Sequence, residues 1–220
     1  MDLLLEHIHS GELIAILGAP GSGKSTLLAY LGSSYQNHII QQSRLRGDLT
    51  WSAASRRGRS VAIDIWERMT DSTSLVSYIR RGSQRNRSFG RIAKLRALHC
   101  LQTVGLGNIA NNLIGSLTFY EKRVLALARA LSAEPELILA DDFITGLPMD
   151  DASKLCGLAG SICKSHGVAC IFSTHRFTIA HSCASRIVLL EGGAIALCAP
   201  PDIVDRSAFN ACISPSRAIP

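Results

Sequence analysis

The eight residues from Gly18 to Ser25, GAPGSGKS, constrain this chain more than any other feature. They fit the pattern G-x-x-x-x-G-K-[ST] and lie between the apolar run LIAIL at 13–17 and the start of a predicted helix at Ser25. Glycines let the backbone curl so that successive N–H groups point at phosphate oxygens, and the helix N-terminus adds partial positive charge. We therefore predict a phosphate-binding loop that binds a nucleotide.

Each residue type in this loop has an expected role. Lys24 should reach the β- and γ-phosphates, the Ser25 hydroxyl should ligate Mg²⁺, and Thr26 should help to hold the α/β-phosphates. A nucleotide bound together with Mg²⁺ is therefore the predicted ligand of this loop. The residues expected to contact the nucleotide are Gly18, Ala19, Pro20, Gly21, Ser22, Gly23, Lys24, Ser25 and Thr26.

Two adjacent carboxylates follow a second apolar run, LILA at 137–140. Asp141 is placed to hold the Mg²⁺ shell through water, and Asp142 is placed to orient an attacking water. Acids after a strand can instead serve as a helix N-cap. Together with the phosphate loop, the pair indicates a nucleotide site that spans two strand ends.

The remaining apolar runs predict an α/β fold. Strands are expected at 13–17, 61–65, 137–140 and 169–173, helices over 74–81, 92–104, 121–131 and 150–166, and a hairpin over 186–198. In the helix over 150–166, Ala152, Leu155, Cys156, Ala159, Ile162 and Cys163 share one face, and Gly167 is its expected C-cap. Strands that alternate with helices imply a largely parallel sheet with helices on both faces. The composition after Pro200 suggests a loose tail.

Composition excludes several classes of protein. With 47% hydrophobic and 18% charged residues, the chain is neither a disordered tail, a collagen nor a small disulfide scaffold. No apolar run approaches the ~20 residues that cross a bilayer. The first residues have no basic n-region, which argues against a signal peptide. The seven cysteines form no CxxC pair, which favours small buried residues in a reducing cytosol over metal ligands or disulfides.

Positive charge is concentrated in one block. Residues 44–96 hold 13 Lys and Arg against 4 Asp and Glu, a net +9, whereas the rest of the chain is −3. Such a block can attract nucleic acid, anionic lipid or an acidic partner, or it can be a solvated surface. Phe89 alone interrupts the densest stretch, 80–96, so a base-stacking platform lacks support.

Two families carry phosphate loops of this kind near the N-terminus. The loop is similar to that of small-molecule kinases such as adenylate kinase, whose lid is rich in arginine. The downstream sequence favours another family. LTFYEKRVLALARAL at 117–131 resembles LSGGEKRRVALARAL, the signature region of ABC ATPases. Segments similar to the family's metal-binding acid, switch histidine and closing hairpin follow in order at 132–147, 171–176 and 186–204.

The resemblance covers roughly residues 3–205 and implies one ABC-type nucleotide-binding domain over 1–205, with a tail at 206–220. The implied fold is a P-loop NTPase with a RecA-like parallel core, an antiparallel β subdomain and a helical subdomain near 70–125. Two such domains would close head to tail over two ATP molecules, as a homo- or heterodimer. The implied function is the ATP-binding subunit of a transporter, coupling ATP hydrolysis to separate integral membrane subunits at the cytoplasmic face of a membrane.

The resemblance also assigns roles to residues outside the loop. His175 matches the switch histidine, although a packed or solvent-facing histidine would fit the same position. Thr118 matches the signature serine that would face the partner's nucleotide. The implied catalytic residues are therefore Asp142, His175 and Lys24, and the implied metal ligands are Ser25 and Asp141.

Several positions depart from the family pattern. Phe119 and Tyr120 stand where the family has two glycines, whose small size lets backbone N–H groups approach a γ-phosphate closely. Asp142 replaces the catalytic Glu. Phe143 replaces Pro, Pro148 replaces Asp, and no glutamine occurs between 43 and 83. The first core strand starts at residue 13, so the family's preceding strand and adenine-stacking aromatic are also expected to be absent.

These departures predict a chain that binds ATP–Mg²⁺ and hydrolyses it slowly or only with a partner. Other functions stay open. They are a regulatory or nucleic-acid-associated ABC-type module, a truncated degenerate copy of a transporter subunit, and a small-molecule kinase. The +9 block spans the attached subdomains, which face partners in this family, so we interpret it as an interface and do not expect nucleic acid to bind.

Overall fold

A mixed sheet forms the centre of the computed structural model, which describes residues 8–32, 60–63, 69–82 and 90–213. The described strands lie in the order β2-β3-β4-β1-β5-β6. The first five are parallel, and β6 pairs antiparallel with β5. The strand bounds are β1 Leu13–Gly18, β2 Ser60–Ile63, β3 Leu137–Ala140, β4 Ala169–Thr174, β5 Arg186–Glu191 and β6 Ala194–Ala199.

Side chains of β1 alternate between two hydrophobic clusters, because successive residues of a strand point to opposite faces of the sheet. Ile14 and Ile16 pack with Leu27 and Leu31 of the helical residues 24–32 on one face. The other face packs against α6 (Phe119–Leu131), α7 (Met149–His166) and α8 (Phe177–Cys183). Burial on both faces explains why the central strands read as continuous apolar runs.

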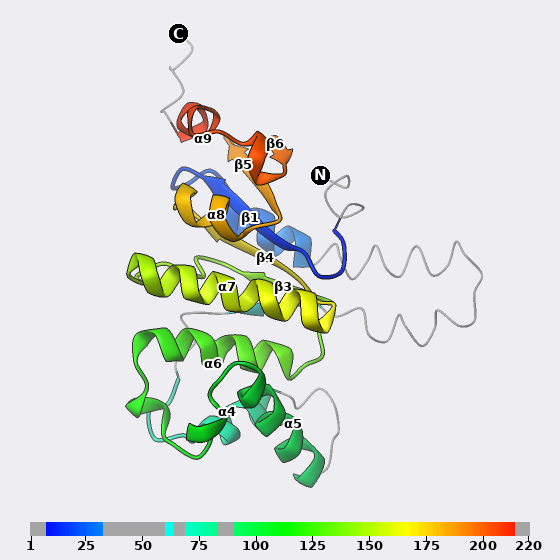
Figure 1. The fold of residues 1–220 in the computed structure, drawn as a ribbon, viewed down its shortest axis with the longest axis vertical. Coiled ribbons are helices and arrows are strands. Elements are labelled where there is room, and N and C mark those ends of the chain that lie inside the picture. The colour runs from blue at the N-terminus through cyan, green and yellow to red at the C-terminus, as the bar shows by residue number, and fades with distance from the viewer. Residues whose placement is uncertain (1–7, 33–59, 64–68, 83–89, 214–220) are drawn as a thin grey trace, which may run out of the picture.

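A layer of helices lies beyond α6 (Figure 1). It contains α4 (Leu75–Gly82), α5 (Gly90–Thr103) and the short 3₁₀ helices η2 (Gly107–Ile109) and η3 (Ile114–Ser116). Leu75, Ile79 and Leu101 of this layer are fully buried and belong to the same hydrophobic cluster as α6. The region thus packs on the core through α6, at the position expected for a helical subdomain.

The structure confirms the predicted α/β architecture, with element ends shifted by one or two residues. The six predicted apolar positions of α7 are all buried, and Gly167 caps the helix in the left-handed conformation. The predicted hairpin is β5–β6. Residues 33–59, where the rest of an antiparallel β subdomain would be sought, lie outside the described residues.

The expectation of a loose tail after Pro200 is wrong for residues 201–213. They form η4 (Pro201–Ile203) and α9 (Arg206–Ile213). The Phe209 ring is buried and stacks on Phe177 of α8, with ring centroids 5.4 Å apart. Contacts with residues far away in the sequence thus accompany a helix in a segment whose composition suggests a coil.

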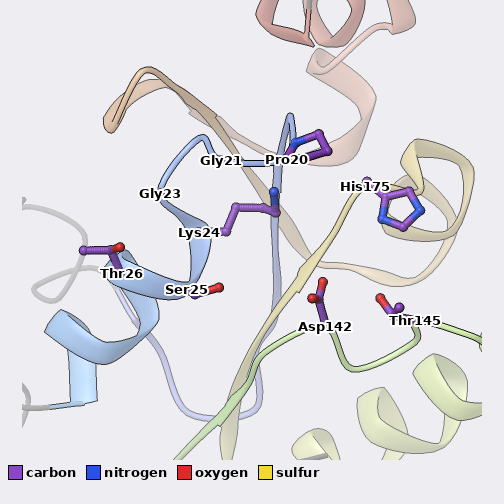
Figure 2. Close-up of a pocket in the computed structure, with 9 residues that line it drawn as sticks. All are labelled: Pro20, Gly21, Gly23, Lys24, Ser25, Thr26, Asp142, Thr145 and His175. Atoms are coloured by element: carbon purple, nitrogen blue, oxygen red, sulfur yellow. The ribbon is translucent and has the colours of Figure 1, made fainter.

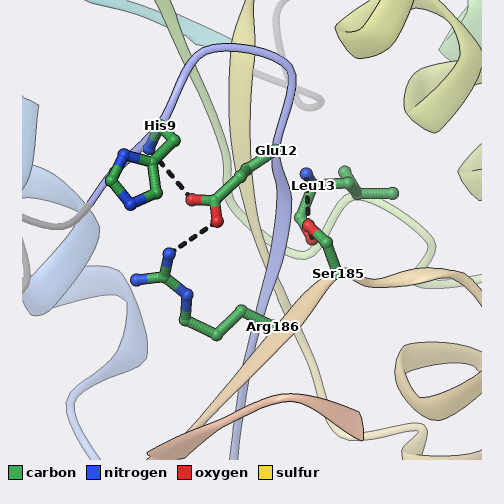
Figure 3. Close-up of polar contacts among 5 residues, drawn as sticks. All are labelled: His9, Glu12, Leu13, Ser185 and Arg186. Atoms are coloured by element: carbon green, nitrogen blue, oxygen red, sulfur yellow. Dashed lines mark hydrogen bonds and ion pairs between the residues drawn. The ribbon is translucent and has the colours of Figure 1, made fainter.

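Polar side chains tie the start of β1 to the start of β5, at the opposite end of β1 from the phosphate loop (Figure 3). Arg186 Nη2 donates to Glu12 Oε1 at 2.5 Å, and the His9 N–H donates to Glu12 Oε2 at 3.0 Å. Ser185 Oγ donates to the Leu13 carbonyl and accepts from the Leu13 N–H. These contacts fix the parallel register of the two strands.

We expect Arg186→Met to lower the free energy of unfolding by about 1–3 kcal/mol. The Arg186 and Glu12 side chains are only 15% and 19% exposed. We therefore expect loss of one partner to cost more stability than in an exposed ion pair and less than in a fully buried one. Reversible urea unfolding measures the effect. The control is Lys154→Met, which breaks an exposed pair with Asp151 and should change stability by less than about 0.5 kcal/mol. Equal unfolding midpoints for wild type and Arg186→Met would contradict the expectation.

All seven cysteines are free, and Cys100, Cys156, Cys163 and Cys170 are buried. Burial raises the pKa of the Cys100 thiol to about 11, so only about one thiol in a thousand is ionised there at pH 8. We expect iodoacetamide to modify the exposed Cys198 long before Cys100 in the native protein, as peptide mass spectrometry would show. Comparable labelling rates at the two positions would contradict this packing.

Among the described residues, no helix is both long and apolar enough to cross a membrane.

Candidate functional site

A cleft of about 440 Å³ opens at the carboxyl ends of β1, β3 and β4 (Figure 2). In open α/β sheets this edge is where ligands bind. The cleft is lined by Pro20, Gly21, Gly23, Lys24, Ser25, Thr26, Asp142, Thr145 and His175. Residues separated by up to 155 positions in the sequence therefore face one space.

The loop after β1 is shaped by its glycines. Gly21 and Gly23 have φ of +78° and +94°, a region that other residues rarely adopt. At Gly18, a Cβ would lie 2.4 Å from Ser22 Oγ and 2.6 Å from the Leu190 carbonyl, so no larger residue fits the present backbone. The loop leads directly into the helical residues 24–32, whose N-terminus is a favourable site for an anion.

The Lys24 amine is held by the loop that carries it. Lys24 Nζ donates to the carbonyls of Gly18 at 3.0 Å and Ala19 at 2.8 Å. Burial lowers the pKa of the amine, while the nearby carboxylates of Asp142 and Asp141 act in the opposite direction. The Lys24 side chain thus shares the cleft with the Asp142 carboxylate.

The two acids after β3 occupy different positions. Asp142 lines the cleft, and its backbone is left-handed with φ of +48°. Asp141 is not among the lining residues. Its Oδ1 accepts from the hydroxyl of the fully buried Ser173 at 2.5 Å, and the same hydroxyl accepts from the Asp142 N–H at 2.8 Å. One β4 serine therefore contacts both acids.

His175 and Thr145 complete the lining of the cleft. His175 is exposed and follows β4 directly, which places its ring at the same sheet edge as the loop. Sequence reasoning missed Thr145. Its N–H donates to the Asp142 carbonyl at 2.9 Å, closing the turn that brings it to the cleft. The sequence does show a hydroxyl residue three positions after the acid pair, but whether its side chain points into the cleft depends on that turn.

The predicted signature residues lie elsewhere. Thr118 is the N-cap of α6 and does not line the cleft. Its hydroxyl accepts from the Glu121 N–H at 3.2 Å and its own N–H donates to Glu121 Oε2 at 2.7 Å, which forms a capping box. The hydroxyl also donates to Glu121 Oε2 at 2.9 Å. The Phe119 side chain is half exposed and lies over the buried Arg123 guanidinium, 4.7 Å from the ring centroid.

The structure thus brings six of the nine predicted loop residues to the cleft, together with Asp142 and His175. Gly18, Ala19 and Ser22 form the loop behind the lining, and Asp141 lies beside it.

Among the described residues, no group of three or more His, Cys, Asp or Glu could hold a metal ion without other ligands. The oxygen donors Ser25 and Asp141 suit Mg²⁺, which usually keeps waters and shares its shell with substrate phosphates.

Comparison with known proteins points to one family. The family model described as ABC transporter matches residues 4–145. The chain is 32% identical over 192 residues to the lipoprotein-releasing system ATP-binding protein LolD 2 of Rhodospirillum rubrum, covering 84% of this chain and 83% of the relative. It is 29% identical over 202 residues to the phosphonates import ATP-binding protein PhnC of Frankia casuarinae, covering 86% and 80%.

Solved structures show the same fold. CbiO1 of Clostridium perfringens, part of the ABC transporter complex CbiONQ, superposes with a TM-score of 0.70 at 22% identity and covers 89% of this chain and 79% of CbiO1. A dimeric ATP-binding cassette bound to ADP and Pi superposes with a TM-score of 0.65 at 23% identity. The match covers 89% of this chain and 88% of the cassette chain. Both are similar to this chain in backbone arrangement.

Proposed function

Because the chain belongs to the ABC transporter family, as an ATP-binding subunit, we propose that it binds ATP with Mg²⁺ and hydrolyses it slowly or only with a partner. ATP hydrolysis is the general activity of the family's ATP-binding domains. The slow or partner-dependent rate is specific to this chain. The observation that carries the proposal is the shared cleft of about 440 Å³, into which the phosphate loop, Asp142 and His175 all face.

The loop supplies the binding function. Lys24 would exchange the Gly18 and Ala19 carbonyls for oxygens of the β- and γ-phosphates, and backbone N–H groups of the loop would hold the rest of the triphosphate. Ser25 and, through water, Asp141 would hold Mg²⁺, which neutralises charge on the phosphates. Asp142 would orient the attacking water, and His175 lines the same cleft.

Two departures support a low rate. Aspartate is one methylene shorter than glutamate, and a well-placed general base contributes about 10²–10⁴ in rate. At the start of α6, Phe119 and Tyr120 stand where the family has two glycines, and Phe119 packs against Gly146. These aromatic side chains leave little room at the helix N-terminus for a phosphate that a second subunit binds.

The partners follow from the family. We propose that the chain pairs with a second ATP-binding domain, homologous or identical, and with integral membrane subunits that carry the cargo. Its place would be peripheral, at the cytoplasmic face of a membrane. The relatives named above are parts of import and release systems.

Isothermal titration calorimetry and phosphate release test the proposal together. We expect the isolated chain to bind ATP–Mg²⁺ at one site, in competition with ADP, and to release phosphate far below the about 10 s⁻¹ of a median enzyme. Addition of a relative with an intact Gly-Gly signature should raise the rate. No saturable binding up to millimolar ATP would overturn the binding function. Turnover near 10 s⁻¹ by the chain alone would overturn the impairment.

A further inference from the structure

Ser173 forms a hydrogen bond with each of the two acids of the site, although it lies 31 residues from the nearer one. It stands in β4 with its side chain fully buried. Its neighbour Phe172 pairs with Ala140, the last residue of β3, so the parallel register sets Ser173 beside the two acids. No motif in the sequence marks this residue.

The hydroxyl of Ser173 is a hydrogen-bond donor to one acid and a hydrogen-bond acceptor from the other. A hydroxyl has one proton to donate, and that proton goes to Asp141 Oδ1 at 2.5 Å. One of its lone pairs accepts the Asp142 N–H at 2.8 Å. Because a hydrogen bond to a charged group in a buried setting is short and directional, the contact restricts rotation of the Asp141 carboxylate.

The hydrogen bond from the Asp142 N–H to Ser173 holds the Asp142 backbone in an unusual conformation. Asp142 has φ of +48°, a left-handed conformation that is unfavourable for residues other than glycine, although aspartate tolerates it better than most. The turn is closed on its other side by the Thr145 N–H, which donates to the Asp142 carbonyl at 2.9 Å. Strained backbone persists where surrounding contacts over-determine it, and such positions cluster at functional sites.

We propose that Ser173 is a positioning residue that holds the Asp141 carboxylate and the Asp142 backbone in the arrangement that couples Mg²⁺ to nucleotide binding. This inference rests on the proposed function, since it concerns the same cleft. Ser173 does not line the cleft, so it would act through the two acids. Its loss would free the Asp141 side chain to rotate and would leave the partly buried Asp142 N–H without its acceptor.

The test measures ATP affinity by calorimetry with Mg²⁺ and again with EDTA. The ratio of the two dissociation constants, the Mg²⁺ gain, reports the coupling without relying on turnover. We expect Ser173→Ala to reduce the Mg²⁺ gain about tenfold or more, while the affinity in EDTA stays within twofold of wild type. Ser173→Thr keeps the hydroxyl and should recover most of the gain.

Ser132→Ala is the matched control. Ser132 is also fully buried, and its hydroxyl donates to the Arg129 carbonyl at 2.7 Å, far from the acid pair. The control loses a buried serine hydroxyl and should show a similar fall in thermal midpoint with an unchanged Mg²⁺ gain. A reduced gain in both variants would assign the effect to general destabilisation and overturn the proposal.

Further outcomes separate this inference from the proposed function. A folded Ser173→Ala chain with a full Mg²⁺ gain overturns the positioning role alone. No ATP binding by wild type overturns the proposed function and this inference with it. If Ser173→Ala does not fold, Ser173→Cys decides, because a thiol of similar size donates weakly. A reduced gain in that variant supports the proposal, and a full gain overturns it.

Discussion

Lys24→Ala is expected to bind ATP–Mg²⁺ about 10²-fold more weakly than wild type, or worse. Charge-assisted hydrogen bonds contribute about 1.5–3 kcal/mol each, and one lysine amine can contact oxygens of two phosphates, so a loss of about 3 kcal/mol corresponds to 10²-fold. The amine already faces a cleft that also contains Asp142. Isothermal titration calorimetry with ATP and Mg²⁺ measures the change.

The control for Lys24→Ala is Lys164→Ala. Lys164 is exposed in the last turn of α7, so this variant removes the same charge from the chain at a distance from the cleft. Its ATP affinity should equal that of wild type. Equal affinities for Lys24→Ala and wild type would show that the amine does not contact the nucleotide.

Gly18→Ala should damage both the loop and the sheet. The new Cβ would approach Ser22 Oγ at 2.4 Å and the Leu190 carbonyl at 2.6 Å. The serine side chain can rotate, but Leu190 belongs to β5, which pairs directly with Gly18 in β1. We expect the free energy of unfolding to fall by about 1–3 kcal/mol, as in overpacked cores, and ATP affinity to fall about tenfold or more.

At Gly157, the same Gly-to-Ala substitution should have the opposite effect on stability. Gly157 lies exposed within α7, and a Cβ there would meet nothing within 4 Å. Alanine should stabilise the protein by about 0.5–1 kcal/mol because glycine is unfavourable in helix interiors. Urea unfolding compares the two variants. A Gly18→Ala chain that is as stable as wild type would show that the loop relaxes around the new methyl group.

Local patterns explain how much of the fold could be predicted. The run at 13–17 and the alternation of strands and helices depend on neighbours a few residues apart, which is why β1, β3, β4, α6 and α7 were predicted with small end errors. The prediction of a loose tail after Pro200 is wrong, because α9 packs on residues distant in the sequence: Phe209 stacks on Phe177, 32 residues earlier.

The site shows the same division between near and distant contacts. The loop from Gly18 to Ser25 could be recognised because its glycines, lysine and serine act through one continuous backbone segment. Thr145 and Ser173 could not, because their roles depend on a left-handed turn at Asp142 and on the register between β3 and β4. The sequence does not indicate which distant carboxylate a serine or threonine hydroxyl will contact.

The sequence by itself determined that this chain has a phosphate loop, a parallel α/β core and an aromatic pair in place of two glycines, because each depends on adjacent residues. The tertiary structure decided which side chains share the cleft, and it placed Ser173 against both acids. The physical reason is that parallel strands bring their carboxyl ends to one edge of the sheet, so residues far apart in the chain become neighbours only after the strands pair.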